Sequence, residues 1–217
     1  MTAPTIDPVQ LASYLDGNAS ELLSEYFRSG RFTGGSFERF AGGGDRPDVA
    51  DRFTSDDIVA VSLLGVRIPG LPALSILGDR EAEFSQMLAG IPAGVDLWEA
   101  EEAAVGPGSA ADRLWRALVA LPGIGWVTAG KLLARKRPRL IPVYDRVVRS
   151  AFGRDGTEDW WRPLRAVLAG NPDTVATLGR LRAESGIGDD VSLLRVLDVC
   201  VWMRERGEPE AVPDAEG

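Results

Sequence analysis

The stretch LPGIGWVTAGKLLARKRPRLIPVYDRVV, residues 121–148, combines a glycine turn, a run of basic residues and one aspartate in an otherwise acidic chain. Pro122-Gly123-Ile124-Gly125 lies between two segments whose apolar residues recur at helical spacing, and its glycines permit a positive φ or a close backbone approach. Ile124 is placed to enter the core and fix the angle between the helices. The stretch therefore predicts two helices joined by a tight hairpin, at about residues 113–136.

The rest of the chain has the same helical periodicity and no convincing alternation of period two, which predicts an all-α fold: a compact helical bundle. We expect a single domain over residues 1–206 and a disordered acidic tail at 207–217. The residues at 54–66, which begin with Thr54 and early acids, are predicted to form the central core helix. Other helices are expected near 9–27, 81–88, 110–121, 144–152, 157–169, 172–184 and 189–205, with a flexible glycine-rich connector at 30–44.

Composition excludes several classes of site. Histidine is absent, so a Ser-His-Asp triad, a Cys-His dyad and a histidine general base are excluded, and a general base must be Asp, Glu, Lys or Tyr. The single cysteine, Cys200, excludes a disulfide framework and a four-cysteine iron–sulfur cluster. The amino terminus lacks the pattern of a signal peptide, and no apolar run reaches the length of a membrane span, so we expect a cytoplasmic protein without membrane contact.

The net charge of −8 is unevenly distributed. Between Arg113 and Arg154 there are ten Lys and Arg residues and one acidic residue, a local net charge of +9, whereas the remaining residues carry −17. Such segregation can produce one face that attracts a polyanion. The alternative is that the acidic part of the chain pairs with the basic part inside the molecule, and the sequence leaves both interpretations open.

The second helix of the hairpin begins near Trp126 with unpaired backbone N–H groups and the positive end of its dipole, which suits a phosphate. Five basic residues follow, of which four lie within five positions: Lys131, Arg135, Lys136, Arg137 and Arg139. This density favours contacts along a phosphate backbone. Compensation of the helix dipole at the carboxy terminus is the structural alternative.

LPGIGWVTAGKLL resembles the helix-hairpin-helix of the base-excision DNA glycosylases, the superfamily of endonuclease III, adenine glycosylase and 3-methyladenine glycosylase II. In that family a Gly/Pro-containing loop and a catalytic aspartate follow the hairpin. Here the loop RKRPRLIP is followed by Asp145, 18 residues after Val127, the separation that we expect between the family's hairpin position and its aspartate. The resemblance spans about residues 114–149 and implies a glycosylase-like bundle of two helical lobes that binds double-stranded DNA.

The resemblance also implies roles for individual residues. Gly123, Ile124, Gly125 and Thr128 would contact a phosphate, and Asp145 would stabilise the sugar cation that forms when an N-glycosidic bond breaks. The base must leave the stack, and the candidates for its pocket or for a wedge are Trp126, Tyr144, Trp160 and Trp161. Backbone carbonyls of Val119, Leu121 and Ile124 would hold a monovalent cation, and no other cofactor is implied.

Val127 stands where bifunctional members carry their Schiff-base lysine, so only a monofunctional glycosylase fits the sequence. The histidine and the cysteine cluster of some members are absent as well. Frequent Ala, Gly and Arg with few lysines are typical of a GC-rich actinobacterial source.

Three alternatives to this enzyme remain open. Asp145 can be an ordinary N-cap residue, because aspartate before a helix commonly has that role. The fold can be a non-catalytic module for DNA binding or protein interaction, or an enzyme that acts on a small nucleoside.

Overall fold

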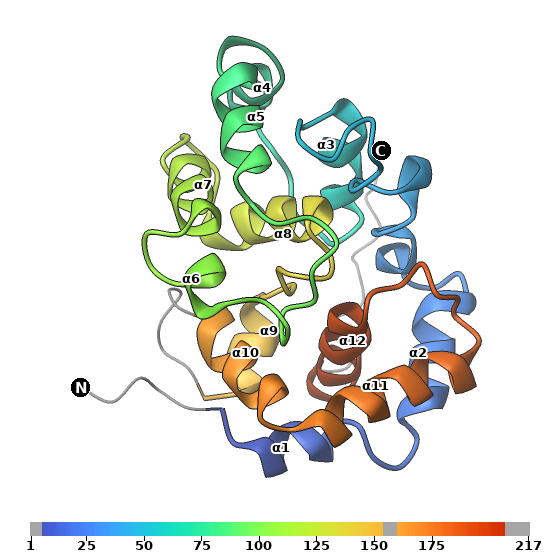
Figure 1. The fold of residues 1–217 in the computed structure, drawn as a ribbon. Helices are drawn as coiled ribbons and strands as arrows, with labels where there is room; N and C mark the ends of the chain where they lie inside the picture. The colour runs from blue at the N-terminus through green and yellow to red at the C-terminus, as the bar shows by residue number, and fades with distance from the viewer. Residues whose placement is uncertain (1–5, 154–159, 207–217) are drawn as a thin grey trace.

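The computed structural model describes residues 6–153 and 160–206, and within these ranges it contains helices and no strand, which confirms the predicted all-α class (Figure 1). The predicted acidic tail at 207–217 lies outside the described residues. The helices are α1 (Pro8–Ser13), α2 (Ala19–Arg28), α3 (Ser55–Ser62), α4 (Gly70–Leu74), α5 (Glu81–Ala89), α6 (Glu102–Val105), α7 (Ala110–Val119), α8 (Trp126–Lys136), α9 (Arg146–Ala151), α10 (Trp161–Ala169), α11 (Pro172–Ser185) and α12 (Leu193–Glu205). Short 3-10 turns η1 (Thr33–Ser36) and η2 (Phe40–Gly42) and a π-helical turn η3 (Ser75–Asp79) complete the set.

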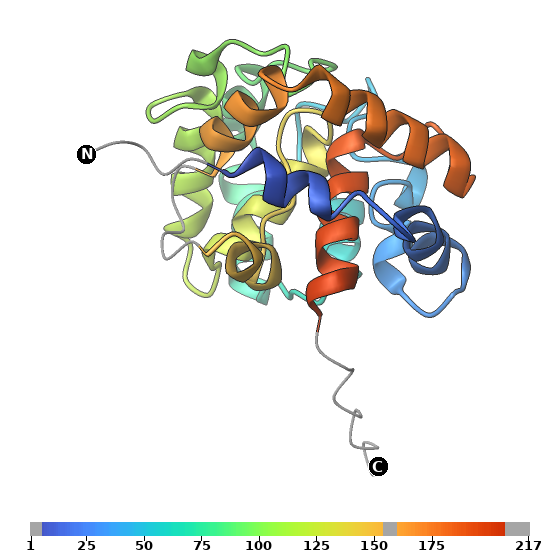
Figure 2. The same cartoon turned by 90° about the horizontal axis from the view of Figure 1, so that it is seen from below.

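The helices pack in two groups that share one hydrophobic core. Helices α2, α9, α11 and α12 form one group, so that the amino-terminal and carboxy-terminal parts of the chain lie together. Helices α3, α5, α7 and α8 form the other, and the contact between α6 and α10 connects the two groups. Figure 2, seen from below, shows α1 crossing the first group near α12.

The centre of the molecule is formed by α8 and α12, which are buried along most of their length. The prediction that residues 54–66 form the central core helix is wrong. Helix α3 ends at Ser62, and Val59 on its outer side is 45% exposed. An apolar run is not sufficient to identify the central helix, because α8 is central despite its lysines and arginine.

Several predicted helix starts are confirmed. Thr54 and Asp57 form a capping box at the start of α3, and the side chain of Ser109 accepts a hydrogen bond from the backbone N–H of Asp112. Pro172 is the first residue of α11, where the helix at 172–184 was expected to begin. These local signals act within one turn of helix, which is why they can be read from sequence.

A buried ion cluster holds α8 against α3. Asp57 is 1% exposed, and its Oδ1 lies 3.2 Å from Nε of Arg135 while its Oδ2 lies 3.0 Å from Nζ of Lys136. Both cations are buried as well. One carboxylate on α3 therefore pairs with two cations at the end of α8, and removal of the carboxylate would leave both without a counter-charge in the core.

The glycine-rich segment at 30–44 is not a flexible connector, contrary to the prediction. It folds over Arg135, whose guanidinium donates hydrogen bonds to the carbonyls of Phe37, Glu38 and Phe40. A Cβ at Gly44 would lie 2.5 Å from the carbonyl oxygen of Arg135. The glycines allow the loop to approach the end of α8 closely, and the buried arginine supplies the donors that the loop carbonyls require.

Among residues 6–153 and 160–206, no helix is both long and apolar enough to cross a membrane.

We predict that Asp57→Ala destabilises the protein by about 3–5 kcal/mol, because it leaves Arg135 and Lys136 buried without a counter-charge. The measurement is the free energy of unfolding in urea, followed by circular dichroism. Asp56→Ala is the matched control, since Asp56 lies in the same first turn of α3 but is not buried, and its loss should cost less than about 1 kcal/mol. Equal effects of the two changes would contradict the role of the ion cluster.

Candidate functional site

The hairpin joins α7 to α8 through residues 120–125, and the two helices pack against each other. Gly123 has a φ of +84°, and a Cβ at this position would lie 2.9 Å from the ring of Pro69. Ile124 is buried, as predicted from its place between the two glycines. The turn is thus fixed by a left-handed glycine, by close contact with the segment before α4 and by an apolar side chain in the core.

Helix α8 begins on Gly125, an N-cap residue that has no side chain to accept a hydrogen bond. The first N–H groups of the helix consequently have no intrahelical partner, and they carry the positive end of its dipole. This end lines a surface depression of about 390 Å³, which we call the hairpin groove. Its lining residues are Leu64, Gly65, Val66, Gly125, Trp126, Val127, Thr128, Lys131, Asp145, Arg146 and Val147.

Asp145 is the N-cap residue of α9, as the structural interpretation of the sequence predicted. Its Oδ1 accepts hydrogen bonds from the backbone N–H groups of Val147 (3.0 Å) and Val148 (3.1 Å). Within the described part of the chain its Oδ2 makes no such bond, and it lies 3.8 Å from Nζ of Lys131. The capping role and exposure to the groove are therefore compatible, because the two oxygens of one carboxylate serve different purposes.

Lys131 extends from α8 toward Asp145 and is nearly buried. Its Nζ donates a hydrogen bond to the carbonyl oxygen of Leu64 at 2.8 Å. Burial lowers the pKa of the Lys131 ammonium group, while the charge of Asp145 opposes that change. Lys131 is not an exposed phosphate contact but a buried cation beside the aspartate.

A second depression, of about 280 Å³, begins at the same residues and extends between α2 and α12. We call it the inner cavity. It shares Leu64, Gly65, Lys131 and Asp145 with the hairpin groove. Asp145 thus lies where a groove beside the hairpin meets a cavity inside the molecule.

Three aromatic rings form one wall of the inner cavity. Tyr26 and Phe32 stack with centroids 5.2 Å apart and an interplanar angle of 9°. The ring of Trp202 meets both edge-on, at 5.7 Å from Tyr26 and 5.9 Å from Phe32. None of these three residues was predicted to belong to the site, because they come from the two ends of the chain.

Arg195 and Asp198, one turn apart on α12, form a buried ion pair that also lines the inner cavity. Nη1 of Arg195 lies 2.6 Å from Oδ2 of Asp198, and Nη2 donates to the Tyr26 hydroxyl at 2.6 Å. Burial raises the pKa of the Asp198 carboxyl to about 7, although the Arg195 guanidinium acts in the opposite direction. The sequence carried a signal for this pair, since two opposite charges at i and i+3 interrupt an otherwise apolar helix.

The prediction that the basic run contacts DNA is wrong for Arg135, Lys136 and Arg137, which are all at most 2% exposed. Arg135 and Lys136 pair with Asp57. Arg137 donates to the carbonyls of Ala50, Leu88 and Ile91 and pairs with Asp51. Here the alternative of internal pairing is correct, because the carboxy-terminal end of α8 points into the core.

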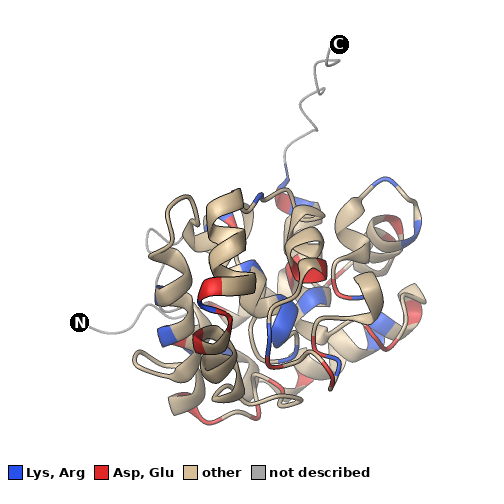
Figure 3. Cartoon of the chain, turned by 90° about the horizontal axis from the view of Figure 1, so that it is seen from above, with Lys and Arg blue, Asp and Glu red and all other residues tan. Residues whose placement is uncertain are grey.

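Arg139 is exposed but pairs with Asp96, beside a depression lined by Asp45, Asp189 and Asp190. It lies outside both the groove and the cavity. Over the described residues, acidic and basic segments are interspersed, and blue segments occur at the centre of the fold (Figure 3). The charge segregation along the sequence therefore does not become a single basic face.

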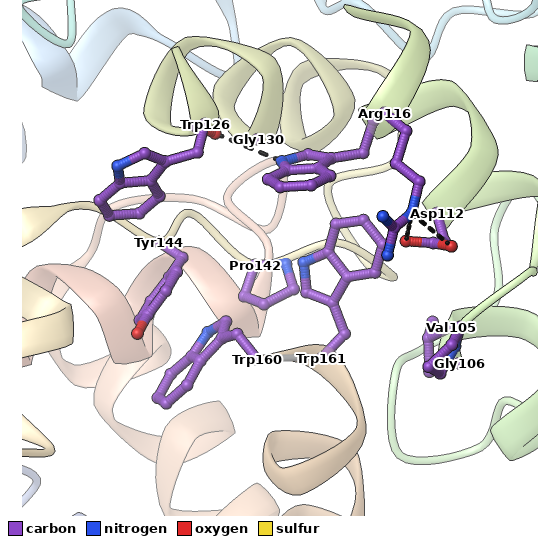
Figure 4. A pocket seen from close by; sticks show the side chains of 12 residues that line it. Val105, Gly106, Asp112, Arg116, Trp126, Gly130, Pro142, Tyr144, Trp160 and Trp161 are labelled. Atoms are coloured by element: carbon purple, nitrogen blue, oxygen red, sulfur yellow. Dashed lines mark hydrogen bonds and ion pairs between the residues drawn. The ribbon is translucent and has the colours of Figure 1, made fainter. Parts of the chain in front are cut away.

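The four predicted aromatic residues come together, but in a third pocket (Figure 4). Trp126, Tyr144, Trp160 and Trp161 line it together with Trp115, and the rings of Tyr144 and Trp160 stack at 4.5 Å. Asp145 does not line this pocket, whose volume is about 70 Å³. Of the four, only Trp126 also lines the hairpin groove. The four aromatic residues therefore do not form a base pocket around Asp145.

The carbonyls proposed for a monovalent cation lie at the hairpin. Val119 ends α7, and the carbonyl of Leu121 accepts the N–H of Ile124 at 3.0 Å inside the turn. The cation remains a prediction.

The fold and the site define an all-helical protein with a glycine hairpin beside a charged, aromatic cavity. The chain belongs to the family of unknown function DUF6308, whose model matches residues 19–205. No curated protein and no solved structure matches the chain. The matched region contains the lining residues of both the hairpin groove and the inner cavity.

We predict that Gly123→Ala destabilises the protein by about 1–3 kcal/mol, because alanine is strained at this φ and its Cβ meets Pro69. The measurement is the midpoint of thermal unfolding. Gly130→Ala, in the interior of α8, is the control: among the described residues, nothing outside the helix's own backbone lies within 4 Å of the new Cβ, and the change should be neutral or stabilise by about 0.5–1 kcal/mol. A Gly123→Ala protein as stable as the unmodified one would contradict a constrained turn.

Proposed function

We propose that this protein binds DNA at the hairpin groove and hydrolyses an N-glycosidic bond, with Asp145 as the catalytic carboxylate. The observation that carries the proposal is the position of Asp145 at the junction of the groove and the inner cavity. A phosphate at the groove, a sugar at the junction and a base beyond it follow the order of groups in a nucleotide. The resemblance of the hairpin and the spacing of Asp145 to the glycosylase superfamily supports the same assignment.

The groove has the features of a small anion site. The uncapped start of α8 supplies backbone N–H groups, and Gly125 leaves room for a close approach of a phosphate. Arg146 lines the groove, Arg149 lies over the Trp126 ring at 5.3 Å, and Arg67 follows Val66. None of these arginines has an ion pair within the described part of the chain, so their charges are available to phosphates.

The chemistry assigned to Asp145 requires a fixed carboxylate. Two backbone hydrogen bonds hold Oδ1, which leaves Oδ2 directed toward Lys131 and the site. As the bond from the sugar to the base breaks, positive charge develops on the sugar, and a carboxylate stabilises it. Water then adds to C1′ with loss of a proton, and the base leaves with the bonding electrons and gains a proton.

The second candidate function is a non-catalytic DNA-binding module. The observation that favours it is the capping role of Asp145, which explains an aspartate at this position without any reaction. The two functions differ in what happens when the carboxylate is replaced.

We predict that the protein binds a duplex with a cationic abasic-site analogue at least tenfold more tightly than the unmodified duplex, and that Asp145→Asn abolishes this preference. Fluorescence anisotropy with labelled duplexes measures both affinities. Asparagine retains an oxygen that can cap α9, so the variant should remain folded, with a loss below about 1 kcal/mol. The same affinity for both duplexes, unchanged in Asp145→Asn, would favour the non-catalytic module, and no binding to either duplex would refute both functions.

We predict a moderate salt dependence of DNA binding. With about three phosphates neutralised, affinity should fall roughly 40-fold between about 50 and 200 mM salt, compared with roughly fourfold for a single phosphate on a small nucleotide. Arg146→Gln should reduce the slope of log affinity against log salt by about one unit. Arg113→Gln is the control, because Arg113 is exposed on α7 but does not line the groove. A slope that Arg146→Gln leaves unchanged would place the DNA elsewhere.

A further inference from the structure

Among the described residues, two that line the inner cavity each have a buried polar atom that the fold does not satisfy. Nε of Arg195 and Oδ1 of Asp198 are buried side-chain atoms without a hydrogen-bond partner. Both residues line the cavity and are at most 5% exposed. Buried polar groups in folded proteins nearly always have a partner, so a donor and an acceptor left open in one ion pair require an explanation.

The remaining atoms of the pair are held firmly. Oδ2 of Asp198 accepts from Nη1 of Arg195, and Nη2 of Arg195 donates to the Tyr26 hydroxyl and to the carbonyl of Gly34 at 3.1 Å. A Cβ at Gly34 would lie 2.0 Å from the Tyr26 hydroxyl oxygen, so this position admits only glycine in the present arrangement. The open donor and the open acceptor are therefore fixed in place before any ligand arrives.

We propose that Arg195 and Asp198 recognise the polar edge of a planar heterocycle that enters the inner cavity. Nε–H of Arg195 donates to a ring nitrogen or carbonyl oxygen of the ligand, and Oδ1 of Asp198 accepts from a neighbouring N–H. The rings of Tyr26, Phe32 and Trp202 supply the apolar surface against which such a ring packs. Nucleobases have this combination of a flat face and adjacent acceptor and donor.

This inference deepens the proposed function, on which it rests for the identity of the heterocycle as a base. It assigns base recognition to α12 and α2, whereas the proposed hydrolysis depends on Asp145 at the start of α9. Arg195 and Asp198 are specificity-determining residues in this assignment and take no part in bond breaking. The two parts of the site can consequently be tested separately.

The test is titration of the unmodified protein with free uracil, hypoxanthine, adenine and cytosine, followed by tryptophan fluorescence and calorimetry. 1,3-Dimethyluracil is the control ligand, because it retains the ring and both carbonyls but has no N–H for Asp198. We expect saturable binding of at least one base, with uracil or hypoxanthine at least tenfold tighter than dimethyluracil if the lactam edge is read. Saturable binding of adenine or cytosine instead would support recognition of an amidine edge, a ring nitrogen beside an exocyclic amino group. The proposal would be overturned if no base binds. It would also be overturned if uracil and its dimethyl derivative are the tightest ligands and bind equally well.

A variant pair extends the test. Asp198→Asn should weaken binding of the preferred base at least tenfold, whereas Arg204→Gln, on the same helix but bonded to the carbonyls of Tyr14 and Asp16, should not change it. Circular dichroism verifies that each variant is folded. If Asp198→Asn does not fold, the comparison of ligands on the unmodified protein decides the matter.

The outcomes also separate the two proposals. Base binding without an effect of Asp145→Asn on the abasic-site analogue would retain the recognition pair and refute hydrolysis. Selective binding of the analogue without any base binding would retain hydrolysis and overturn the recognition pair.

Discussion

The arrangement of this protein depends on the pairing of α8's carboxy-terminal cations with Asp57 inside the core. Asp57 faces Arg135 and Lys136, and no other carboxylate among the described residues pairs with either. Such a cluster is not necessarily more stable than an apolar core, but it is highly specific, since any other orientation of α3 or of the loop at 30–44 would leave a buried charge uncompensated. The cluster thus fixes the direction of α8, and the start of α8 is the floor of the hairpin groove.

The ion cluster affects the site because the two lie at opposite ends of α8. The carboxy-terminal end of α8 is held in the core by Asp57 and by loop carbonyls, so its amino-terminal end is presented at the surface beside α9. Lys131 lies between the two ends of α8. Its Nζ donates a hydrogen bond to the carbonyl oxygen of Leu64 and lies 3.8 Å from Oδ2 of Asp145. A chain with a net charge of −8 can therefore keep a small electropositive groove, although most of its basic run is consumed by internal pairing.

The site divides into parts with different physical origins. Asp145 is positioned by the backbone of its own helix, a local arrangement that needs only a few residues. The inner cavity is assembled from α2 and the residues that follow it, the residues after α3, and α12. Its ion pair is held by Tyr26 and Gly34, which are more than 160 residues away in the chain. Packing of α2 against α12 is what creates the cavity.

By itself, the sequence determined the all-α class, the hairpin between α7 and α8, several helix starts and the place of Asp145 before α9. These features depend on residues within a few positions of one another, where helical periodicity, glycine turns and capping side chains act. Only the tertiary structure decided which charges reach solvent: Arg135, Lys136 and Arg137 were predicted at a DNA surface and lie in the core. It also decided that the four predicted aromatic residues form a pocket apart from Asp145: Trp126, Tyr144, Trp160 and Trp161. The residues that line the inner cavity beside Asp145 include Arg195 and Asp198. The physical reason is that burial and charge pairing are set by partners distant in the chain, such as Asp57 for Arg135, and no local pattern specifies those partners.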